Sequence, residues 1–380
     1  MKKRSSQSSE TRSKQAIEKK KILIAFGTRP EAIKLCPLIK ELEKREKAQV
    51  RVCISSQHKE LLRGVLDDFG VRADYDLGVM STSQTLFDVT ERVLERIREV
   101  LSREMPDVVV VHGDTTTAFA ASLACFYMNI PVAHVEAGLR TKNIRSPFPE
   151  EFNRRAIALT ARYHFAPTMS ARQNLLREGI DGENIFVTGN TVIDALSTTV
   201  SPHFAHPLLD GAIGKRIIFF TAHRRENICS LEDMLRAVFR LVEKYPDVLF
   251  IYPVHPNPRV RDVAERVLGR CDGVKLCSPL GVYECHNILA RSYLVLTDSG
   301  GLQEEAAALG VPVLVMRDET ERCDGIKLGI SALVGTKGHK IFEKVCEILD
   351  NSELRERMSC SENPYGDGNA SKAISDVLLI

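Results

Sequence analysis

The sequence has 380 residues, 44% of them hydrophobic, and a formal net charge of +2. This length favours two domains over one, the hydrophobic share is that of an ordinary globular protein, and no run of about 18 apolar residues predicts a membrane span. The basic start is followed by no apolar segment, so we predict no secretory signal and expect a cytoplasmic location.

The positive charge is concentrated at the start of the chain. Residues 1–20 hold seven Lys or Arg and two Glu without apolar periodicity, which predicts a disordered basic tail. No basic stripe or recognition motif follows, so no nucleic-acid partner is expected. The ten cysteines form no CxxC pair, which indicates reduced and mostly buried thiols rather than a metal site.

Strand and helix patterns alternate through the first half of the chain. Short apolar runs predict strands at 21–28 and 49–56, and in DVVVVHGD, PVAHVEA, HFAPT and IFVTGNT. Helices are predicted from Pro30, near 58–68, over about 83–104 and over 117–128.

The second half repeats this alternation. Strands are predicted at 216–223, 247–255, in VKLCSP, at 293–300 and at 311–318, and the segment 201–215 is rich in turn residues and predicts a linker. The strand runs are too apolar for a sheet with one solvated face, so they predict parallel strands covered on both faces. The expected fold is α/β, with two Rossmann-like doubly wound domains, 21–200 and 201–366, that face a central cleft.

Polar residues follow most of these strands. In an open parallel sheet such strand ends face the ligand crevice. The first half supplies Gly27-Thr28-Arg29, Gln57-His58, His112-Gly113-Asp114, Glu136 and Gly189-Asn190, and the second half supplies His223-Arg224-Arg225-Glu226, His255 and Ser299-Gly300-Gly301. So many polar strand ends predict a ligand-filled cleft, although any single His among them is more often a packed or capping residue than a catalytic one.

The segment TDSGGLQEEAAALG (297–310) carries a phosphate signal. Ser299, Gly300 and Gly301 precede a helix expected to begin near Leu302, and bare N–H groups at a helix start bind phosphate. Glu304 and Glu305 would follow in the first turn, where a carboxylate can accept the hydroxyls of a ribose. An ordinary N-cap with acidic first-turn residues explains the same pattern, so both interpretations remain open.

Cations near the first strand suit a diphosphate. Arg29 and Lys34 lie near the start of the first helix, and the planar fork of an Arg binds two oxygens at once. The chain contains no Walker sequence and no GxGxxG after a strand, so no bound nicotinamide or other cofactor is expected.

Three carboxylates lie close together in the sequence, each in or at the end of a distinct short motif. Asp114 ends DVVVVHGD, Glu136 ends the PVAHVE strand signal, and Glu150 lies in SPFPEE. Carboxylates that converge in different environments can divide acid and base roles, so they predict an enzyme that transfers protons.

Long stretches of the chain resemble the non-hydrolysing UDP-N-acetylglucosamine 2-epimerases. The similar stretches run from about residue 22 to 367 and are FGTRPEAIKLCPLI, HGDTTTAFAASLA, HVEAGLRT, SPFPEEFNRR, VTGNTVIDAL, TAHRREN, YPVHPNP, LTDSGGLQEEAAALGVPVLVMRDETER and NPYGDG. The resemblance implies a glycosyltransferase-B-like fold, a homodimer, no metal and no nicotinamide. It also implies that the last helix, within 367–380, crosses back to the N-terminal domain.

The resemblance also implies roles for single residues. Asp114, Glu136 and Glu150 would be the acid/base set, with His223 as the active-site histidine beside the diphosphate. The remaining substrate-binding positions would be Arg29, Lys34, Arg140, Asn190, Ser299, Gly300, Gly301 and Glu305, with Glu305 on the ribose. A possible second, regulatory substrate site would use Gln57, His58, Arg224 and His255.

The expected reaction is the interconversion of UDP-GlcNAc and UDP-ManNAc. Because C2 of the sugar has no adjacent carbonyl, we expect anti elimination of UDP, a 2-acetamidoglucal intermediate and re-addition of UDP, with acids or bases on both faces of the ring. A hydrolysing epimerase, an epimerase of a related UDP-acetamido sugar, a nucleotide-sugar glycosyltransferase and a non-catalytic UDP-sugar sensor remain alternatives. The sequence departs from the family pattern at one place that bears on sugar specificity. Cys323-Asp324 stands where the family has Pro-Glu, and the loss of the proline should loosen that turn.

Overall fold

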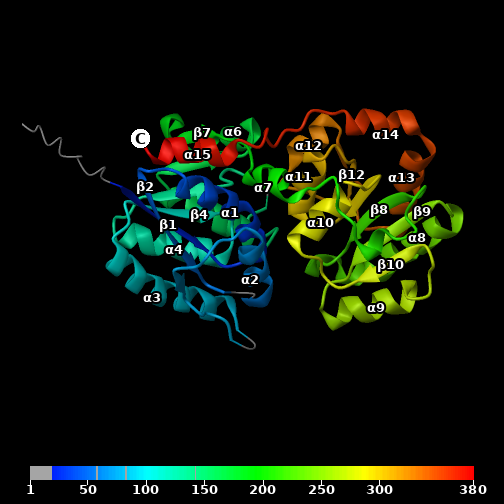
Figure 1. Ribbon diagram of the computed structural model, residues 1–380, viewed down its shortest axis with the longest axis horizontal. Helices are drawn as coiled ribbons and strands as arrows, with labels where there is room; N and C mark the ends of the chain where they lie inside the picture. The colour runs from blue at the N-terminus through cyan, green and yellow to red at the C-terminus, as the bar shows by residue number, and fades with distance from the viewer. Residues whose placement is uncertain (1–18, 57–58, 82–83, 142) are drawn as a thin grey trace, which may run out of the picture.

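The structure is a computed structural model that describes residues 19–56, 59–81, 84–141 and 143–380, without the side chains of 59–61 and 225–226. The predicted basic tail therefore lies outside the described residues, except for its last two positions. Figure 1 shows two α/β units side by side, each built on its own sheet.

The N-terminal unit is built on a seven-stranded parallel sheet in the order β3-β2-β1-β4-β5-β6-β7. The strands are β1 (Lys20–Phe26), β2 (Ala48–Ile54), β3 (Tyr75–Asp76), β4 (Val108–His112), β5 (Val132–Val135), β6 (Tyr163–Ala166) and β7 (Ile185–Val187). Its helices are α1 (Arg29–Glu43), α2 (Lys59–Asp68), α3 (Leu86–Glu104), α4 (Thr116–Tyr127), α5 (Glu150–Thr160), α6 (Met169–Arg177) and α7 (Thr191–Thr199), with a short η1 (Gly182–Asn184).

The C-terminal unit is built on a six-stranded parallel sheet in the order β10-β9-β8-β11-β12-β13. The strands are β8 (Arg216–Thr221), β9 (Val248–Pro253), β10 (Val274–Cys277), β11 (Leu294–Thr297), β12 (Val313–Val315) and β13 (Ser331–Leu333). Its helices are α8 (Leu231–Lys244), α9 (Pro258–Leu268), α10 (Val282–Leu289), α11 (Gly300–Ala308), α12 (Cys323–Leu328), α13 (Gly338–Asp350) and α14 (Ser352–Ser359), with short η2 (Pro207–Leu209) and η3 (Arg225–Ser230).

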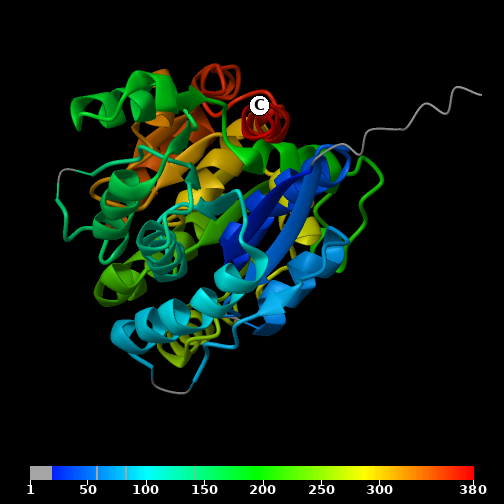
Figure 2. The same ribbon diagram turned by 90° about the vertical axis from the view of Figure 1, so that its left-hand side faces the viewer.

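Both sheets are apolar on their two faces, as the continuous hydrophobic runs predicted. Along β1, Ile22 and Ile24 pack in one core with α1, whereas Leu23 and Ala25 pack in another core with α3 and α4. Figure 2 looks onto the N-terminal unit, where helices cover the sheet on both sides. A parallel strand buried on two faces needs no polar alternation, which explains sequences such as VVVVH in β4.

Each sheet reverses its strand order once, and these two points position the candidate site. In the N-terminal unit the order reverses between β1 and β4, and in the C-terminal unit it reverses between β8 and β11. Ligands of open α/β sheets bind at the carboxyl ends of the strands beside such a switch point. The segments after these four strands contain Arg29, Asp114, His223 and Ser299.

The chain passes between the two units twice, at the two ends of α7. After its C-terminal end, Ser201 donates its backbone N–H to Asn287 Oδ1 at 2.7 Å. At its N-terminal end, Asn190 donates its backbone N–H to the carbonyl of Tyr365 at 2.7 Å. The chain then enters α15 (Ala370–Leu378), which packs on α1 and α7 and is the red helix over the N-terminal unit in Figure 1.

The predicted strands and helices are confirmed in kind and in order, with three local differences. The helix expected over about 83–104 begins at Leu86, where Thr85 and Asp88 form a capping box. The helix expected from Leu302 begins two residues earlier, at Gly300. The edge strands β3 and β13 were not predicted, because two and three residues are too few to show periodicity. Within the described residues, no helix is long and apolar enough to cross a membrane.

Candidate active site

Glu31 joins the ends of the two strands that flank the N-terminal switch point. Its carboxylate accepts hydrogen bonds from the backbone N–H groups of Gly27 and Thr28 at 3.0 and 2.8 Å, and from the hydroxyl of Thr115 at 2.8 Å. Burial raises the pKa of Glu31 to about 7, although these hydrogen bonds oppose the rise. This carboxylate therefore fixes the segments that carry Arg29 and Asp114.

Glu136 lies at the centre of a buried group of charges. It follows β5 with a positive φ of 62°, an uncommon conformation for a residue with a side chain, and such strain is often found at functional sites. Its carboxylate forms an ion pair with Lys34 and accepts a hydrogen bond from Asn190 Nδ2 at 2.9 Å. The structure therefore brings three of the predicted site residues together.

Residues of the C-terminal unit complete this group. Lys34 Nζ also lies 2.9 Å from Glu304 Oε2, and Arg322 lies 3.7 Å from Glu136 Oε1 and 3.1 Å from Glu304 Oε1. Lys34, Glu136, Asn190, Glu304 and Arg322 are each less than a tenth exposed, and we call them the Glu136 cluster. The cleft predicted between the two units is therefore closed by side chains at this point.

The pKa values in the cluster follow from burial and charge together. Burial alone would raise the pKa of Glu136, but Lys34, the nearby His112 and Arg322 lower it far below its usual range. Burial raises the pKa of Glu304, against the opposing effect of Arg322 and Lys34. Burial lowers the pKa of His112, whose Nε2 lies 3.8 Å from Glu136 Oε2, to about 4. Glu136 is thus an anion facing a neutral imidazole.

Asp114 and Glu150 form a second acidic site near this cluster. Asp114 pairs with the buried guanidinium of Arg154 on α5, and Arg154 Nη1 lies 3.3 Å from Glu151 Oε2. Glu150 is the first residue of α5, and burial raises its pKa, with the charge of Asp114 adding to the rise. The three predicted carboxylates therefore have three different surroundings.

His223 lies at the C-terminal switch point and remains reachable, since its side chain is 39% exposed. Its Nδ1 lies 3.2 Å from Oδ1 of the fully buried Asp298, and its ring stacks on that of His255 with centroids 5.8 Å apart. The backbone N–H of Arg224 donates to Asp298 Oδ2 at 2.9 Å. Two residues predicted for different sites, His223 and His255, thus lie together.

The start of α11 differs in detail from the prediction. Ser299 is the N-cap but accepts no capping hydrogen bond, and Gly300 begins the helix. Glu304 and Glu305 therefore lie beyond the first turn, which corrects their predicted position. A Cβ at residue 300 would lie 2.6 Å from Arg322 Nη1, so Gly300 is needed for the guanidinium to lie across the helix start.

Glu305 is held by a histidine that the sequence did not single out. His286 Nε2 on α10 lies 3.5 Å from Glu305 Oε2. Burial would raise the pKa of Glu305, but His286 together with the charges of Lys34 and Arg29 lowers it. Glu305 is therefore an anion near the cations predicted for a diphosphate, as a ribose acceptor would need to be. Gly301 lies beside it, since a Cβ there would be 3.4 Å from Glu305 Oε1.

Two predicted substrate-binding arginines are engaged within the protein. Arg29 Nη2 donates to the carbonyl of Leu280, at 2.5 Å, and so links α1 to the C-terminal unit. Arg140 forms two hydrogen bonds with Glu178, at 2.8 and 2.7 Å, and does not join the Glu136 cluster. Its substrate role stays a prediction, as does the regulatory role of Gln57 and His58, which lie outside the described residues.

The Cys323-Asp324 departure lies at a contact between the units. Cys323 begins α12, and the Asp324 carboxylate accepts hydrogen bonds from the hydroxyls of Thr168, at 2.7 Å, and Ser170. Thr168 is also the N-cap of α6. The predicted loosening of this turn is therefore offset here by a tie between α12 and α6.

Several residues at the site were missed as functional candidates. Arg154, Asp298 and Arg322 lie within the quoted motifs, and Glu304 was named beside Glu305 without being placed in the expected site. The sequence could have indicated them only through their place in the motifs that carry the family resemblance. Spacing along the chain does not show which charged residues meet across the two units.

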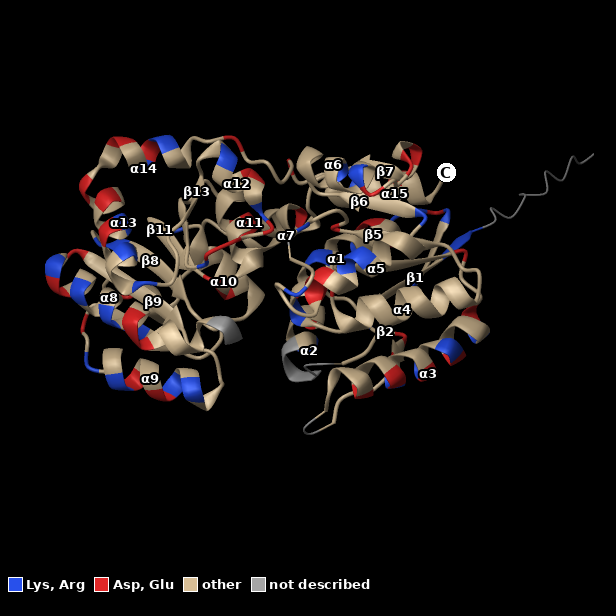
Figure 3. Ribbon diagram, turned by 180° about the vertical axis from the view of Figure 1, so that it is seen from behind, with Lys and Arg blue, Asp and Glu red and all other residues tan. Residues whose placement is uncertain are grey.

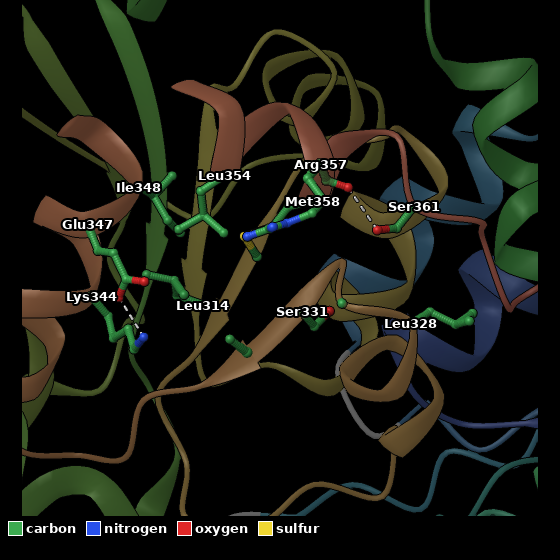
Figure 4. A pocket seen from close by; sticks show the side chains of 12 residues that line it. Leu314, Leu328, Ser331, Lys344, Glu347, Ile348, Leu354, Arg357, Met358 and Ser361 are labelled. Atoms are coloured by element: carbon green, nitrogen blue, oxygen red, sulfur yellow. Dashed lines mark hydrogen bonds and ion pairs between the residues drawn. The ribbon is translucent and has the colours of Figure 1, made fainter. Parts of the chain in front are cut away.

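A separate hollow of about 320 Å³ lies in the C-terminal unit and contains none of the predicted site residues. Figure 4 shows the side chains that line it, which include the apolar Leu314, Ile348 and Met358 and the basic Lys344 and Arg357. Across the part of the chain that the structure describes, no group of three or more His, Cys, Asp or Glu side chains could hold a metal ion. All ten cysteines are free thiols.

Comparison with known proteins assigns the chain to a family. Residues 40–379 match the family model described as UDP-N-acetylglucosamine 2-epimerase. The UDP-N-acetylglucosamine 2-epimerase of Bacillus subtilis strain 168 is 48% identical over 364 residues, which cover 96% of both chains.

Solved structures agree with this assignment. The UDP-GlcNAc 2-epimerase of Neisseria meningitidis, solved with UDP-GlcNAc, has a TM-score of 0.90 and 43% identity, and the match covers 94% of this chain and 99% of that one. S. aureus MnaA, in a co-structure with UDP, has a TM-score of 0.90 and 45% identity over 93% of this chain and 94% of that one.

Proposed function

Because the chain belongs to the UDP-N-acetylglucosamine 2-epimerase family, we propose that it interconverts UDP-GlcNAc and UDP-ManNAc reversibly, without releasing free sugar. The observation that carries this proposal is the set of three carboxylates, two that follow β4 and β5 and one at the start of α5, each in a different electrostatic environment. Epimerisation at C2 removes a proton from one face of the sugar ring and returns one to the other. Both an ionised and a protonated carboxyl are therefore needed.

The surroundings of the three carboxylates support this division of roles. Glu136 is held as an anion by Lys34 and Arg322, whereas burial and Asp114 favour the protonated form of Glu150. Carboxyl pairs with pKa values pushed apart in this way can serve as base and acid at one pH. Which of them acts on which epimer is decided by the face of the ring that each one meets.

The proposed reaction has two half-steps with one intermediate. A carboxylate takes the C2 proton, the electron pair forms the C1–C2 double bond, and the bond from C1 to the diphosphate oxygen breaks. This step releases UDP and 2-acetamidoglucal within the site. Protonation of C2 from the opposite face and attack of UDP on C1 then give the epimer. Arg29, Lys34 and His223 would stabilise the charge of the departing diphosphate.

The cations of the Glu136 cluster suit an anionic substrate. Lys34 pairs with both Glu136 and Glu304, so a diphosphate would compete for the same ammonium group. Binding would then free part of the negative charge of Glu136 from its salt bridge and make it a stronger base. Cations that exchange partners in this way couple substrate binding to proton removal.

The alternatives predict different products or sites. A hydrolysing epimerase would release ManNAc and UDP, and an epimerase of another UDP-acetamido sugar would leave UDP-GlcNAc unchanged. A sensor would bind without turnover, and a glycosyltransferase would exchange no proton on carbon. Three carboxylates in distinct environments favour the epimerase, since transfer of a glycosyl group alone removes no proton from carbon.

Proton NMR of UDP-GlcNAc with the purified protein in deuterium oxide tests the proposal. We expect deuterium at C2 and growth of UDP-ManNAc to a steady ratio. Accumulation of free ManNAc and UDP would replace the proposal with the hydrolysing reaction, and a spectrum that stays unchanged while UDP-GlcNAc binds would refute it. Asp114→Asn should abolish the exchange and leave UDP binding largely intact, as measured by calorimetry.

The proposal includes a homodimer formed through exposed apolar residues of the N-terminal unit. Helix α4 contains no charged residue and is tan in Figure 3, and α4 packs beside α5. Large apolar side chains are exposed on these two helices: Phe126, Tyr127, Phe152 and Leu159. Such clusters are typical of protein interfaces. Light scattering after gel filtration should give twice the chain mass of 42.4 kDa, and a monomer at micromolar concentration would contradict this.

A second, regulatory substrate molecule remains part of the proposal, bound near Arg224 and His255. Because His255 stacks on His223, a ligand there would lie against a proposed active-site residue. Calorimetry with UDP-GlcNAc should therefore show two sites per chain, and His255→Ala should remove one of them. A single site in the unaltered protein would contradict this part of the proposal.

A further inference from the structure

The carboxylate of Asp298 has one oxygen with several partners and one oxygen with none of good geometry. Oδ2 accepts the backbone N–H groups of His223 and Arg224, each at 2.9 Å, and Nδ2 of Asn227 at 3.1 Å. Among the described residues, no hydrogen bond of standard geometry reaches Oδ1, although it is buried. A buried carboxylate oxygen requires a donor.

The imidazole of His223 is placed to be this donor. Its Nδ1 lies 3.2 Å from Asp298 Oδ1, within reach of a hydrogen bond after a small rotation of the ring. The backbone N–H of the same residue donates to the other oxygen, so Asp298 holds His223 at two points. The guanidinium Nε of Arg224 donates to the carbonyl of Asp298, at 3.0 Å, and keeps the two loops together.

We propose that Asp298 is a positioning residue that holds His223 as the tautomer protonated on Nδ1, so that Nε2 is the nitrogen that faces the substrate. The inference rests on the proposed function only in assigning His223 to the active site. A neutral imidazole that donates through Nδ1 presents an acceptor lone pair at Nε2. When Nε2 takes up a proton from solvent as the diphosphate enters, the imidazolium donates that proton to the leaving diphosphate oxygen, and the anionic Asp298 stabilises the imidazolium until then.

The stacked neighbour of His223 is anchored in the opposite way. The ring of His255 is nearly parallel to that of His223, with 3° between the planes, and its Nδ1 accepts the backbone N–H of Asn257 at 3.1 Å. A neutral His255 therefore carries its proton on Nε2. Because the two adjacent imidazoles are expected to carry their protons on opposite nitrogens, the NMR signals of His255 serve as an internal reference for those of His223.

Nitrogen-15 NMR of histidine-labelled protein tests the proposal directly. The chain has ten histidines, so the His223 and His255 signals are assigned with His223→Asn and His255→Asn. We expect the Nδ1–H tautomer at His223 and the Nε2–H tautomer at His255. The Nε2–H tautomer at His223 in the unaltered protein would overturn the proposal, because Asp298 would then not receive the ring proton.

The substitution Asp298→Asn should reverse the tautomer of His223. The amide oxygen would stay with the three N–H donors and turn the NH₂ group toward Nδ1, which must then accept. For UDP-GlcNAc turnover, kcat should fall roughly 10²-fold with a smaller change in KM, since general acid catalysis contributes at least that much. An unchanged tautomer in this variant would refute the inference.

Asn227→Ala is the matched control. It removes one donor to Asp298 Oδ2 and leaves Oδ1 opposite His223, so the Nδ1–H tautomer should persist. If Asp298→Asn does not fold, the spectrum of the unaltered protein still decides the matter. Failure of UDP-GlcNAc turnover in the unaltered protein would refute the proposed function without changing the tautomer, so the two failures are distinguishable.

Discussion

Replacing Arg322 by Gln should leave an unbalanced charge buried between the two units. The guanidinium lies 3.1 Å from the Glu304 carboxylate and 3.7 Å from that of Glu136, and it also pairs with Glu321. At an effective dielectric constant of about 20, one such pair at this separation attracts by about 5 kcal/mol. Desolvation offsets part of this attraction, and breaking a buried pair destabilises a protein by about 3–5 kcal/mol.

The loss of stability should depend on pH through Glu304. Burial raises the pKa of Glu304 while Arg322 and Lys34 oppose the rise, so removal of Arg322 should raise this pKa further. A carboxyl with a raised pKa binds its proton more tightly in the folded than in the unfolded state. Stability therefore falls as the pH rises from the unfolded pKa through the folded one. The deficit of Arg322→Gln should be larger at about pH 8 than at about pH 5.5.

Urea unfolding of four proteins measures the effect: the unaltered chain, Arg322→Gln, Glu304→Gln and the double variant. Because the double variant removes one charge of each sign, it should recover about 1–3 kcal/mol relative to the sum of the single changes. Arg317→Gln is the control, since Arg317 lies 3.1 Å from Glu321, which also pairs with Arg322. The reasoning fails if Arg322→Gln loses less than about 1 kcal/mol or if the two changes are additive.

Three further substitutions test other parts of the site. Glu150→Gln should lower kcat about 10²–10⁴-fold. Burial raises the pKa of Glu150, so in the unaltered protein the rate should fall at high pH as this carboxyl loses its proton. That fall should be missing from the pH–rate profile of any residual activity of the variant. Asp324→Ala should lower stability by roughly 2 kcal/mol in thermal unfolding, because two hydroxyl donors lose a charged acceptor. Lys327→Ala is the control, since Lys327 is an exposed partner 3.8 Å from Asp324, and it should change stability by less than about 0.5 kcal/mol. Gly300→Ala should lower stability by about 1–3 kcal/mol in the same assay, since its Cβ would lie 2.6 Å from the guanidinium across the helix start; Gly301→Ala, with its nearest neighbour at 3.4 Å, should have a smaller effect.

The sequence predicted the strands well because their signal is local. In β4 and β8, continuous apolar runs bounded by polar residues left one interpretation, a strand buried on both faces. Helix starts were less certain, since Gly300 and Gly301 have low helix propensity yet form the first turn of α11. Glu305 was therefore predicted two residues too close to the start of the helix.

The composition of the Glu136 cluster could not be predicted from sequence. Lys34 and Glu304, which form an ion pair, are 270 residues apart, and no periodicity relates residues of different units. The strand ends of each sheet were predicted correctly, but the meeting of the two sets depends on how the units pack. For the same reason the sequence indicated the TDSGG segment as a phosphate site without showing that Asp298 faces His223.

The two chain crossings at the ends of α7 restrict how the units can move. Two rigid bodies joined at one point can rotate about any axis through it, whereas two joined at separate points can rotate only about the line between them. Here that line joins the backbone contacts of Asn190 with Tyr365 and of Ser201 with Asn287, and so runs close to α7. We therefore expect opening and closing to follow a single rotational coordinate, which returns Arg322 and Glu304 to Glu136 in the same register each time. Inserting flexible residues into either crossing would add further axes and broaden the set of closed arrangements.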